Sequence, residues 1–194
     1  MFEQQPTARA DLKPGTLYAV AGEGGWVFYA QATSDKHLGF FRRRDREPAE
    51  ASVVLATPIM SVIVVAYPSI TRALRSGRWK KLGRFSLADE LIEPQRMVQW
   101  PVGTLTVSVW CADGTTRETL VDDPEIQDME LMAVWDAEHH IPARLTADFS
   151  EDQAQWHVGG PIRRERRIKE EMAARSPDQP WRKLPDDWVP TSIR

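Results

Sequence analysis

The first third of the chain alternates apolar and polar positions in a way that predicts antiparallel strands. Residues 16–20 and 26–32 both alternate with a period of two, and both are rich in aromatic and β-branched side chains, which fit a pleated surface. Between them, residues 22–25 contain three glycines, which accept positive φ in a tight hairpin. A third run, at residues 38–42, follows a polar turn. We therefore predict three antiparallel strands that begin a small curled sheet.

The next segment predicts strands interrupted by one short helix. Residues 61–66 are apolar on both faces, as in a central strand that is covered on both sides. Residues 53–56 favour a shorter strand before them. Residues 68–77 favour a helix, because a proline opens the segment and a glycine closes it. Residues 78–83 favour a return strand with Trp79 placed inward. We expect the first two strands and residues 61–66 in one mainly antiparallel sheet with Trp79 packed against it.

The second half shows weaker patterns. A strong Asp113-Gly114 turn joins two predicted strands, 104–111 and 115–121. The other expected elements are a capped helical turn at 86–91, an acidic helix at 125–136, strands at 143–148 and 155–158, and a charged helix at 163–175. From residue 176 onward, prolines and tryptophans alternate with polar residues, which favours an extended arm packed on its own domain.

These elements predict an α+β protein with a mainly antiparallel, barrel-like β-sheet, a few short helices and a Pro/Trp-rich C-terminal arm. The expected organisation has three parts. A β-rich domain spans residues 12–83. An acidic α+β region spans 99–160 and is either a separate part or continuous with the first domain. The charged helix and arm span 161–194.

Composition narrows the class of protein. The 194 residues are 42% hydrophobic and 27% charged, as in a globular domain. A single cysteine, Cys111, allows no internal disulfide and favours a reducing compartment. The first residues do not read as a signal peptide, and the longest apolar run is shorter than a membrane span. We therefore expect a cytoplasmic protein without a membrane partner.

The charge is unevenly distributed along the chain. Residues 101–160 carry 12 acidic and 2 basic side chains, a net charge of −10, although the whole chain carries only −3. Such asymmetry bears on partners more than on fold. One interpretation is a solvated acidic face docked on the chain's own basic ends. The other is a surface that attracts a basic partner.

Few residues suggest catalysis. Asp136, Glu138, His139 and His140 form the densest set of metal-ligand types, but adjacent histidines point in different directions and rarely share one ion. Cys111 follows an apolar strand, where an inert thiol is expected. Nucleophile-elbow and phosphate-loop motifs are missing from the sequence. We therefore expect no metal, no cofactor and no enzymatic activity.

Two arginine-rich segments raise the question of nucleic acid. Residues 42–50 form a charged, proline-containing loop whose three adjacent arginines, 42–44, suit either phosphate binding or a charge-protected edge strand or loop, and we favour the second interpretation. Residues 163–167 contain four arginines and read as a solvated helix end. Because the whole chain is acidic and no nucleic-acid-reading motif is present, we expect no nucleic acid among the partners.

The order of motifs in residues 12–83 resembles a known family. Pro14-Gly15 precedes an apolar strand, a Gly-rich hairpin, an aromatic strand and a buried β-run, and a short helix then ends in Gly77-Arg78-Trp79-Lys80-Lys81-Leu82-Gly83. This order resembles the Immunity protein 26 family of bacterial polymorphic toxin systems. The resemblance implies an immunity protein that binds and neutralises a cognate toxin through protein–protein contacts. It covers under half of the chain, and the second half does not follow from it.

The leading hypothesis is therefore a toxin-binding protein, with nucleases as one class of toxin that its acidic block would suit, since nucleases have basic clefts. The expected partner-binding residues are Asp122, Asp123, Glu125, Asp128, Glu130, Trp26 and Trp79. One alternative is an enzyme or small-ligand protein with a pocket in the β-rich core. Another is a regulatory module that forms a homodimer through exposed tryptophans. The sequence leaves the toxin's identity and the oligomeric state open.

Overall fold

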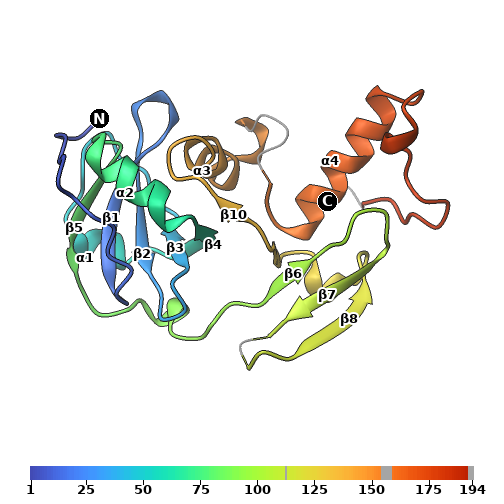
Figure 1. The fold of residues 1–194 in the computed structure, drawn as a ribbon, viewed down its shortest axis with the longest axis horizontal. Helices are drawn as coiled ribbons and strands as arrows, with labels where there is room; N and C mark the ends of the chain where they lie inside the picture. The colour runs from blue at the N-terminus through green and yellow to red at the C-terminus, as the bar shows by residue number, and fades with distance from the viewer. Residues whose placement is uncertain (112, 154–158, 192–194) are drawn as a thin grey trace. The chain divides into compact units, whose positions relative to one another are not determined.

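The computed structural model describes residues 1–111, 113–153 and 159–191, and within these ranges the protein is α+β with ten strands in two sheets and four α-helices. The chain forms two compact units (Figure 1). Unit 1 comprises Met1–Gln95 and Ala133–Val158, and unit 2 comprises Arg96–Met132 and Gly159–Arg194. The chain thus leaves unit 1, returns to it and leaves again. As a result, the segment expected as one acidic region, 99–160, is divided between the two units.

Unit 1 contains a six-stranded sheet of order β10-β4-β3-β2-β1-β5. All neighbouring strands are antiparallel except β10, which runs parallel to β4. This confirms the predicted mainly antiparallel sheet. Its strands are β1 (Thr16–Ala21), β2 (Val27–Ala32), β3 (Leu38–Phe41), β4 (Ile59–Val65), β5 (Trp79–Arg84) and β10 (Val134–Trp135). Between β1 and β2 the 3-10 turn η1 (Glu23–Gly25) holds Gly24 and Gly25 at φ of 61° and 75°, so the glycines have the predicted role.

Both faces of this sheet are covered, as Figure 1 shows for α1 (Ala51–Leu55) and α2 (Tyr67–Arg75). Strand alternation sends Tyr18 to the face that carries α2 and α3 (Ile141–Phe149), and Leu17 to the opposite face. Trp79 is 1% exposed, with its ring centroid 5.7 Å from that of Tyr18 and 6.4 Å from that of Phe40. The predicted packing of Trp79 is confirmed.

Three element predictions are wrong. Residues 53–55 belong to α1 and Ala56 caps it, instead of forming a strand, because a single helical turn buries Val54 while leaving Val53 44% exposed. Residues 143–148 lie in α3, where Ile141, Arg144 and Leu145 are buried at helical spacing. The expected helix at 125–136 is replaced by the turn η3 (Pro124–Ile126) and by the short strands β9 (Glu130–Leu131) and β10. In each case a partner distant in sequence overrides the local pattern.

Other boundaries shift by smaller amounts. The helical turn near residue 86 is η2 (Asp89–Leu91), and its cap is Ala88 instead of Ser86. The side-chain amide of Gln31 holds this segment by donating to the Ser86 carbonyl, at 2.9 Å, and by accepting from the Ala88 amide, at 3.0 Å. The turn η4 (Glu151–Gln153) follows α3. The strand predicted at 155–158 lies outside the described residues.

Unit 2 contains a four-stranded sheet of order β8-β7-β6-β9. It is formed by β6 (Met97–Gln99), β7 (Thr106–Trp110), β8 (Thr116–Leu120) and β9. The predicted hairpin is confirmed, because β7 and β8 pair antiparallel around Asp113 and Gly114. Both sheets are open, so the expected barrel-like closure is not confirmed.

The last part of unit 2 is the helix α4 (Ile162–Arg175), as predicted, followed by the arm, which includes η5 (Pro180–Arg182). The arm packs back on its own unit. The indole rings of Trp188 and Trp100 stack with centroids 6.0 Å apart and an interplanar angle of 16°. One carboxylate oxygen of Glu170 accepts hydrogen bonds from the Trp188 indole and from the amide and hydroxyl of Thr191.

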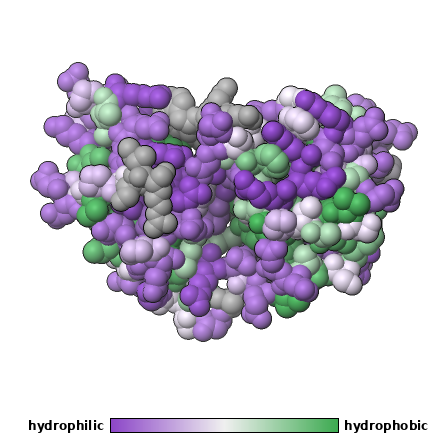
Figure 2. Space-filling view, turned by 180° about the vertical axis from the view of Figure 1, so that it is seen from behind, coloured by the Kyte–Doolittle hydropathy of each residue, from purple (hydrophilic) through white to green (hydrophobic). Residues whose placement is uncertain are grey.

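The surface is mostly polar. On the face shown in Figure 2, hydrophilic side chains predominate and apolar ones are scattered in small groups. Across the described ranges, no helix combines the length and the apolar character needed to cross a membrane.

Candidate functional site

The acidic segment identified in the sequence is divided between the two units. Asp122 to Glu130 lie in unit 2, whereas Asp136 and Glu138 lie in unit 1. The two groups therefore have different surroundings.

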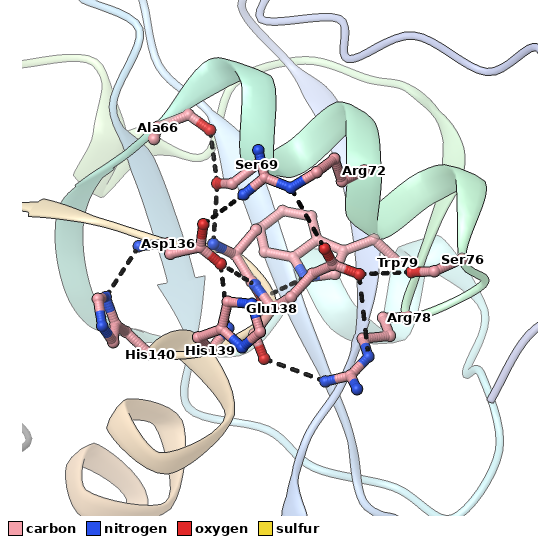
Figure 3. A network of polar contacts seen from close by, with 11 residues as sticks. Ala66, Ser69, Arg72, Ser76, Arg78, Trp79, Asp136, Glu138, His139 and His140 are labelled. Carbon is pink, nitrogen blue, oxygen red and sulfur yellow. Dashed lines mark hydrogen bonds and ion pairs between the residues drawn. The ribbon is translucent and has the colours of Figure 1, made fainter.

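In unit 1, Asp136 and Glu138 belong to a polar network with α2 and the start of β5 (Figure 3). One oxygen of Asp136 accepts from Arg72 Nη2 at 2.5 Å. Its other oxygen accepts from the backbone amides of Glu138 and His139, at 2.9 and 3.1 Å. Asp136 therefore closes the turn that leads into α3, much as a capping residue does.

These contacts control the charge of Asp136. Partial burial alone would raise the pKa of its carboxyl group, but the two backbone amides and the nearby Arg72 outweigh that effect and hold the pKa below its ordinary value. Asp136 is therefore a fixed anion at neutral pH, unsuited to proton transfer there.

Glu138 and the backbone beside it complete the network (Figure 3). The Ser76 hydroxyl donates to Glu138 Oε1 at 2.7 Å, and Arg72 Nε lies 3.5 Å from Oε2. The guanidinium of Arg78 donates to the Glu138 carbonyl oxygen at 3.1 Å. The amide of Ala137 donates to the Ser69 hydroxyl at 2.9 Å. These bonds attach residues 136–138 to unit 1, so here the arrangement supports the fold.

The two histidines of this turn face different partners. His140 Nδ1 accepts from the Asp136 amide at 3.2 Å, and its ring meets Trp135 edge-on with centroids 5.9 Å apart. His139 lies on the other side of the turn in Figure 3. Among the residues that the structure describes, no three His, Cys, Asp or Glu side chains are grouped as a metal site would require.

In unit 2, the carboxylates surround η3. Asp123 caps this turn, because its side chain accepts from the Glu125 amide at 2.9 Å and from the Thr119 hydroxyl at 2.6 Å. The Thr119 hydroxyl, the Glu125 amide and nearby Arg117 together lower the pKa of Asp123. The η3 turn is thus fixed to strand β8.

The exposed carboxylates beside it are the strongest candidates for partner contact. The side chains of Glu125 and Asp128 are 73% and 89% exposed. Arg117 Nη2 lies 3.2 Å from Glu125 Oε2, and Arg163 Nε lies 2.8 Å from Asp128 Oδ1. We call Asp122, Asp123, Glu125, Asp128 and Glu130 the acidic surface. Residues 122–130 carry these five carboxylates and no basic side chain, and Asp122, Asp123 and Glu130 are half-buried.

The two tryptophans among the expected partner-binding residues lie in unit 1 and differ in access. Trp79 is buried, and its indole donates to the Ala137 carbonyl at 3.3 Å, so it has no surface to offer a partner in this fold. The expectation of partner contact at Trp79 is corrected on that ground. Trp26 is half-buried, with the guanidinium carbons of Arg44 and Arg46 4.4 and 3.6 Å from its ring centroid.

The arginines around Trp26 form a second cluster, which the sequence pattern did not predict. Phe149 of α3 lies under Arg44 and Arg42, with centroid distances of 4.3 and 5.8 Å. The four arginines in residues 42–46 were the available signal. What the sequence could not show is that Phe149, over 100 residues later, joins them.

Comparisons with known proteins found no similar protein. No family model, no curated protein and no solved structure matches the chain.

Proposed function

We propose that the protein is a binding protein whose unit 2 presents the acidic surface to a basic protein partner. The observation that carries the proposal is the exposure of Glu125, within the capped turn η3, and of Asp128, just after it. Because η3 is fixed to β8 through Asp123 and Thr119, these charges are held in place before the partner arrives. Preorganised charge loses less conformational entropy on binding than charge on a loose segment.

The expected mechanism is electrostatic steering. Like charges gathered on one surface raise association rates by roughly 10- to 1000-fold at low salt and affect dissociation less. The arginines Arg117 and Arg163 weaken the field of the acidic surface without cancelling it. A basic partner would exchange these exposed internal pairs for its own, which is inexpensive because exposed ion pairs contribute about 0–1 kcal/mol.

The partner proposed is a cognate toxin of a bacterial polymorphic system, which the protein neutralises in the cytoplasm. The support is the resemblance of residues 12–83 to the Immunity protein 26 family, together with an acidic surface that suits the basic cleft of a nuclease. The competing proposal, an enzyme or a small-ligand protein, would be favoured by a polar pocket that binds a metabolite. Asp136, a carboxylate with histidine neighbours, is instead engaged by Arg72 and by backbone amides of its own turn.

The test is a kinetic binding experiment with the purified toxin domain encoded beside this chain's gene, at about 50 mM and about 200 mM salt. The variant E125Q/D128N removes two exposed charges and leaves the cap Asp123 intact. We expect it to associate several-fold more slowly than the parent at the lower salt, and to show a weaker salt dependence. Inhibition of the toxin's activity is measured in parallel.

The matched control is E3Q/E93Q, which removes two exposed carboxylates from unit 1 instead. This variant should associate at the rate of the parent. Equal slowing by both variants would show that only the net charge matters, and the acidic surface would lose its role. A toxin domain that neither binds the parent nor is inhibited by it would reject the proposed function itself.

A further inference from the structure

Unit 1 carries a row of alternating arginine and aromatic side chains that the proposed function does not use. The ring contacts run from Arg42 to Phe149, from Phe149 to Arg44, from Arg44 to Trp26 and from Trp26 to Arg46. We call these five residues the arginine–aromatic ladder. Its members come from the junction of η1 and β2, from the segment after β3 and from the end of α3, so the fold assembles it from three places.

The three cations of the ladder lack carboxylate partners. Within residues 1–111, 113–153 and 159–191, no carboxylate lies within ion-pair distance of Arg42, Arg44 or Arg46. Their neighbour Arg43 differs, since its Nε lies 2.7 Å from Asp45 Oδ2. Arg46 donates one hydrogen bond, to the Gly24 carbonyl at 2.6 Å. Among the described residues, the ladder therefore holds three positive charges with no carboxylate partner to balance them.

Protection of a sheet edge does not explain these charges. The segment follows β3, which lies between β2 and β4 in the interior of the sheet. Moreover, Asp45 exchanges backbone hydrogen bonds with Val27 at 2.8 and 3.0 Å, so this stretch is itself paired. The sequence favoured a charge-protected edge strand or loop. Residues 42–50 form a loop between β3 and α1, so the loop applies and the edge strand does not.

We infer that the arginine–aromatic ladder binds the phosphate backbone of a single-stranded nucleic acid. Arg42 and Arg44 share the Phe149 ring, and Arg44 and Arg46 share the Trp26 ring, so each of the three cations can meet a different phosphate of a polyanion. A guanidinium stacked on a ring still presents its N–H edge for two parallel bonds to a phosphate. Arginines interleaved with aromatic rings are also the combination that proteins use for single strands, where bases stack on exposed ring surface. The net negative charge of the whole chain does not exclude binding of a nucleic acid, because the ligand interacts mainly with the charges close to its site.

The ladder suits a short contact that does not read sequence. Phosphate contacts of this kind position a strand and are strongly salt-dependent. With three phosphates neutralised, the logarithm of the affinity should fall with the logarithm of salt concentration with a slope of about −2. Affinity should therefore fall about 15-fold between about 50 mM and about 200 mM salt.

The experiment measures fluorescence polarisation of a labelled oligothymidylate about 12 nucleotides long, with the full chain, at these two salt concentrations. We expect R44Q to weaken binding at low salt and to reduce the slope by about 0.7. R44K, which keeps the charge but loses the planar fork, should retain the slope while losing affinity. R9Q is the matched control, because it removes one exposed unit 1 arginine outside the ladder. Circular dichroism checks that each variant is folded.

Three outcomes would overturn the inference. The first is a parent chain with no affinity for the oligonucleotide at low salt. The second is an R9Q variant that loses as much affinity as R44Q. The third is polyglutamate of similar length that competes as well as the oligonucleotide. The last result would identify a surface for acidic peptides instead. The toxin-binding proposal is tested separately, since it rests on unit 2 and on other variants.

Discussion

The indole nitrogen of Trp79 donates a hydrogen bond to the carbonyl oxygen of Ala137, 3.3 Å away and 58 residues later in the chain. This bond joins β5 to the segment that returns to unit 1 after the chain has formed part of unit 2. It also explains why a tryptophan, and not another large apolar residue, suits this buried position, since the indole supplies a donor for an otherwise buried carbonyl.

Replacing Trp79 by phenylalanine should destabilise unit 1 by about 2–4 kcal/mol. The change leaves the Ala137 carbonyl without its donor, which costs about 1–3 kcal/mol, and it also leaves part of the packed volume empty. Urea denaturation followed by circular dichroism measures the loss. A variant as stable as the parent would mean that the contact with Ala137 contributes nothing.

Replacing Asp136 by asparagine should lower stability by about 1 kcal/mol at pH 7, because the amide keeps an acceptor for the backbone but loses the charge that attracts Arg72. The folded-state pKa of Asp136 is lowered, so the stabilisation is present above its unfolded value of about 3.8 and is lost as the pH falls through the folded value. Parent and variant should therefore become equally stable as the pH falls below about 3.8. Denaturation curves between neutral and acid pH measure this, and a constant difference would exclude the charge as the cause.

Replacing Tyr29 by phenylalanine should change the response to alkali. Burial raises the pKa of the Tyr29 hydroxyl to about 12, although the Ala49 amide that donates to it opposes the shift. The raised pKa means that the stabilisation is complete below the unfolded value of about 10 and is lost as the pH rises through 12.

The Y29F variant should therefore be less stable than the parent near pH 8, by about 1–2 kcal/mol, because the Ala49 amide loses its acceptor. Its stability should decline less than that of the parent between about pH 10 and 12. Urea denaturation across this interval, with tyrosinate absorbance as a second readout, measures both effects. Parallel curves for the two proteins would contradict the assignment to Tyr29.

Replacing Glu170 by glutamine should loosen the C-terminal arm. One oxygen of Glu170 accepts three hydrogen bonds from Trp188 and Thr191, and bonds to a charged acceptor are about twice as strong as neutral ones. Trypsin should then cut after Lys183 several-fold faster, since cleavage requires the arm to leave α4. The neighbouring variant E171Q is the control, because Glu171 lies in the same helix and is paired with Arg175. Equal cleavage of the two variants would show that Glu170 does not hold the arm.

The local sequence pattern was sufficient to predict an element where residues close together in the chain determine its conformation. Twofold alternation placed β1 and β2, the glycines at 24 and 25 took the positive φ that their turn requires, and a proline and Gly77 bounded α2. In unit 2 the Asp113-Gly114 turn located the β7–β8 hairpin in the same way. These features depend on contacts within a few residues, so the sequence by itself determined them.

Only the tertiary structure decided the features that join distant segments. Residues 51–55 and 141–149 became helices because one face of each meets the core, which outweighs the strand preference of their β-branched or alternating residues. The surroundings of each charged side chain were also decided only by the tertiary structure. Asp136 is engaged by Arg72, whereas Arg44 lies between Trp26 and Phe149 with no carboxylate partner among the described residues. The sequence gives the charged and aromatic residues that a chain contains. The interaction energy of each side chain, however, depends on neighbours that only folding brings within a few ångströms.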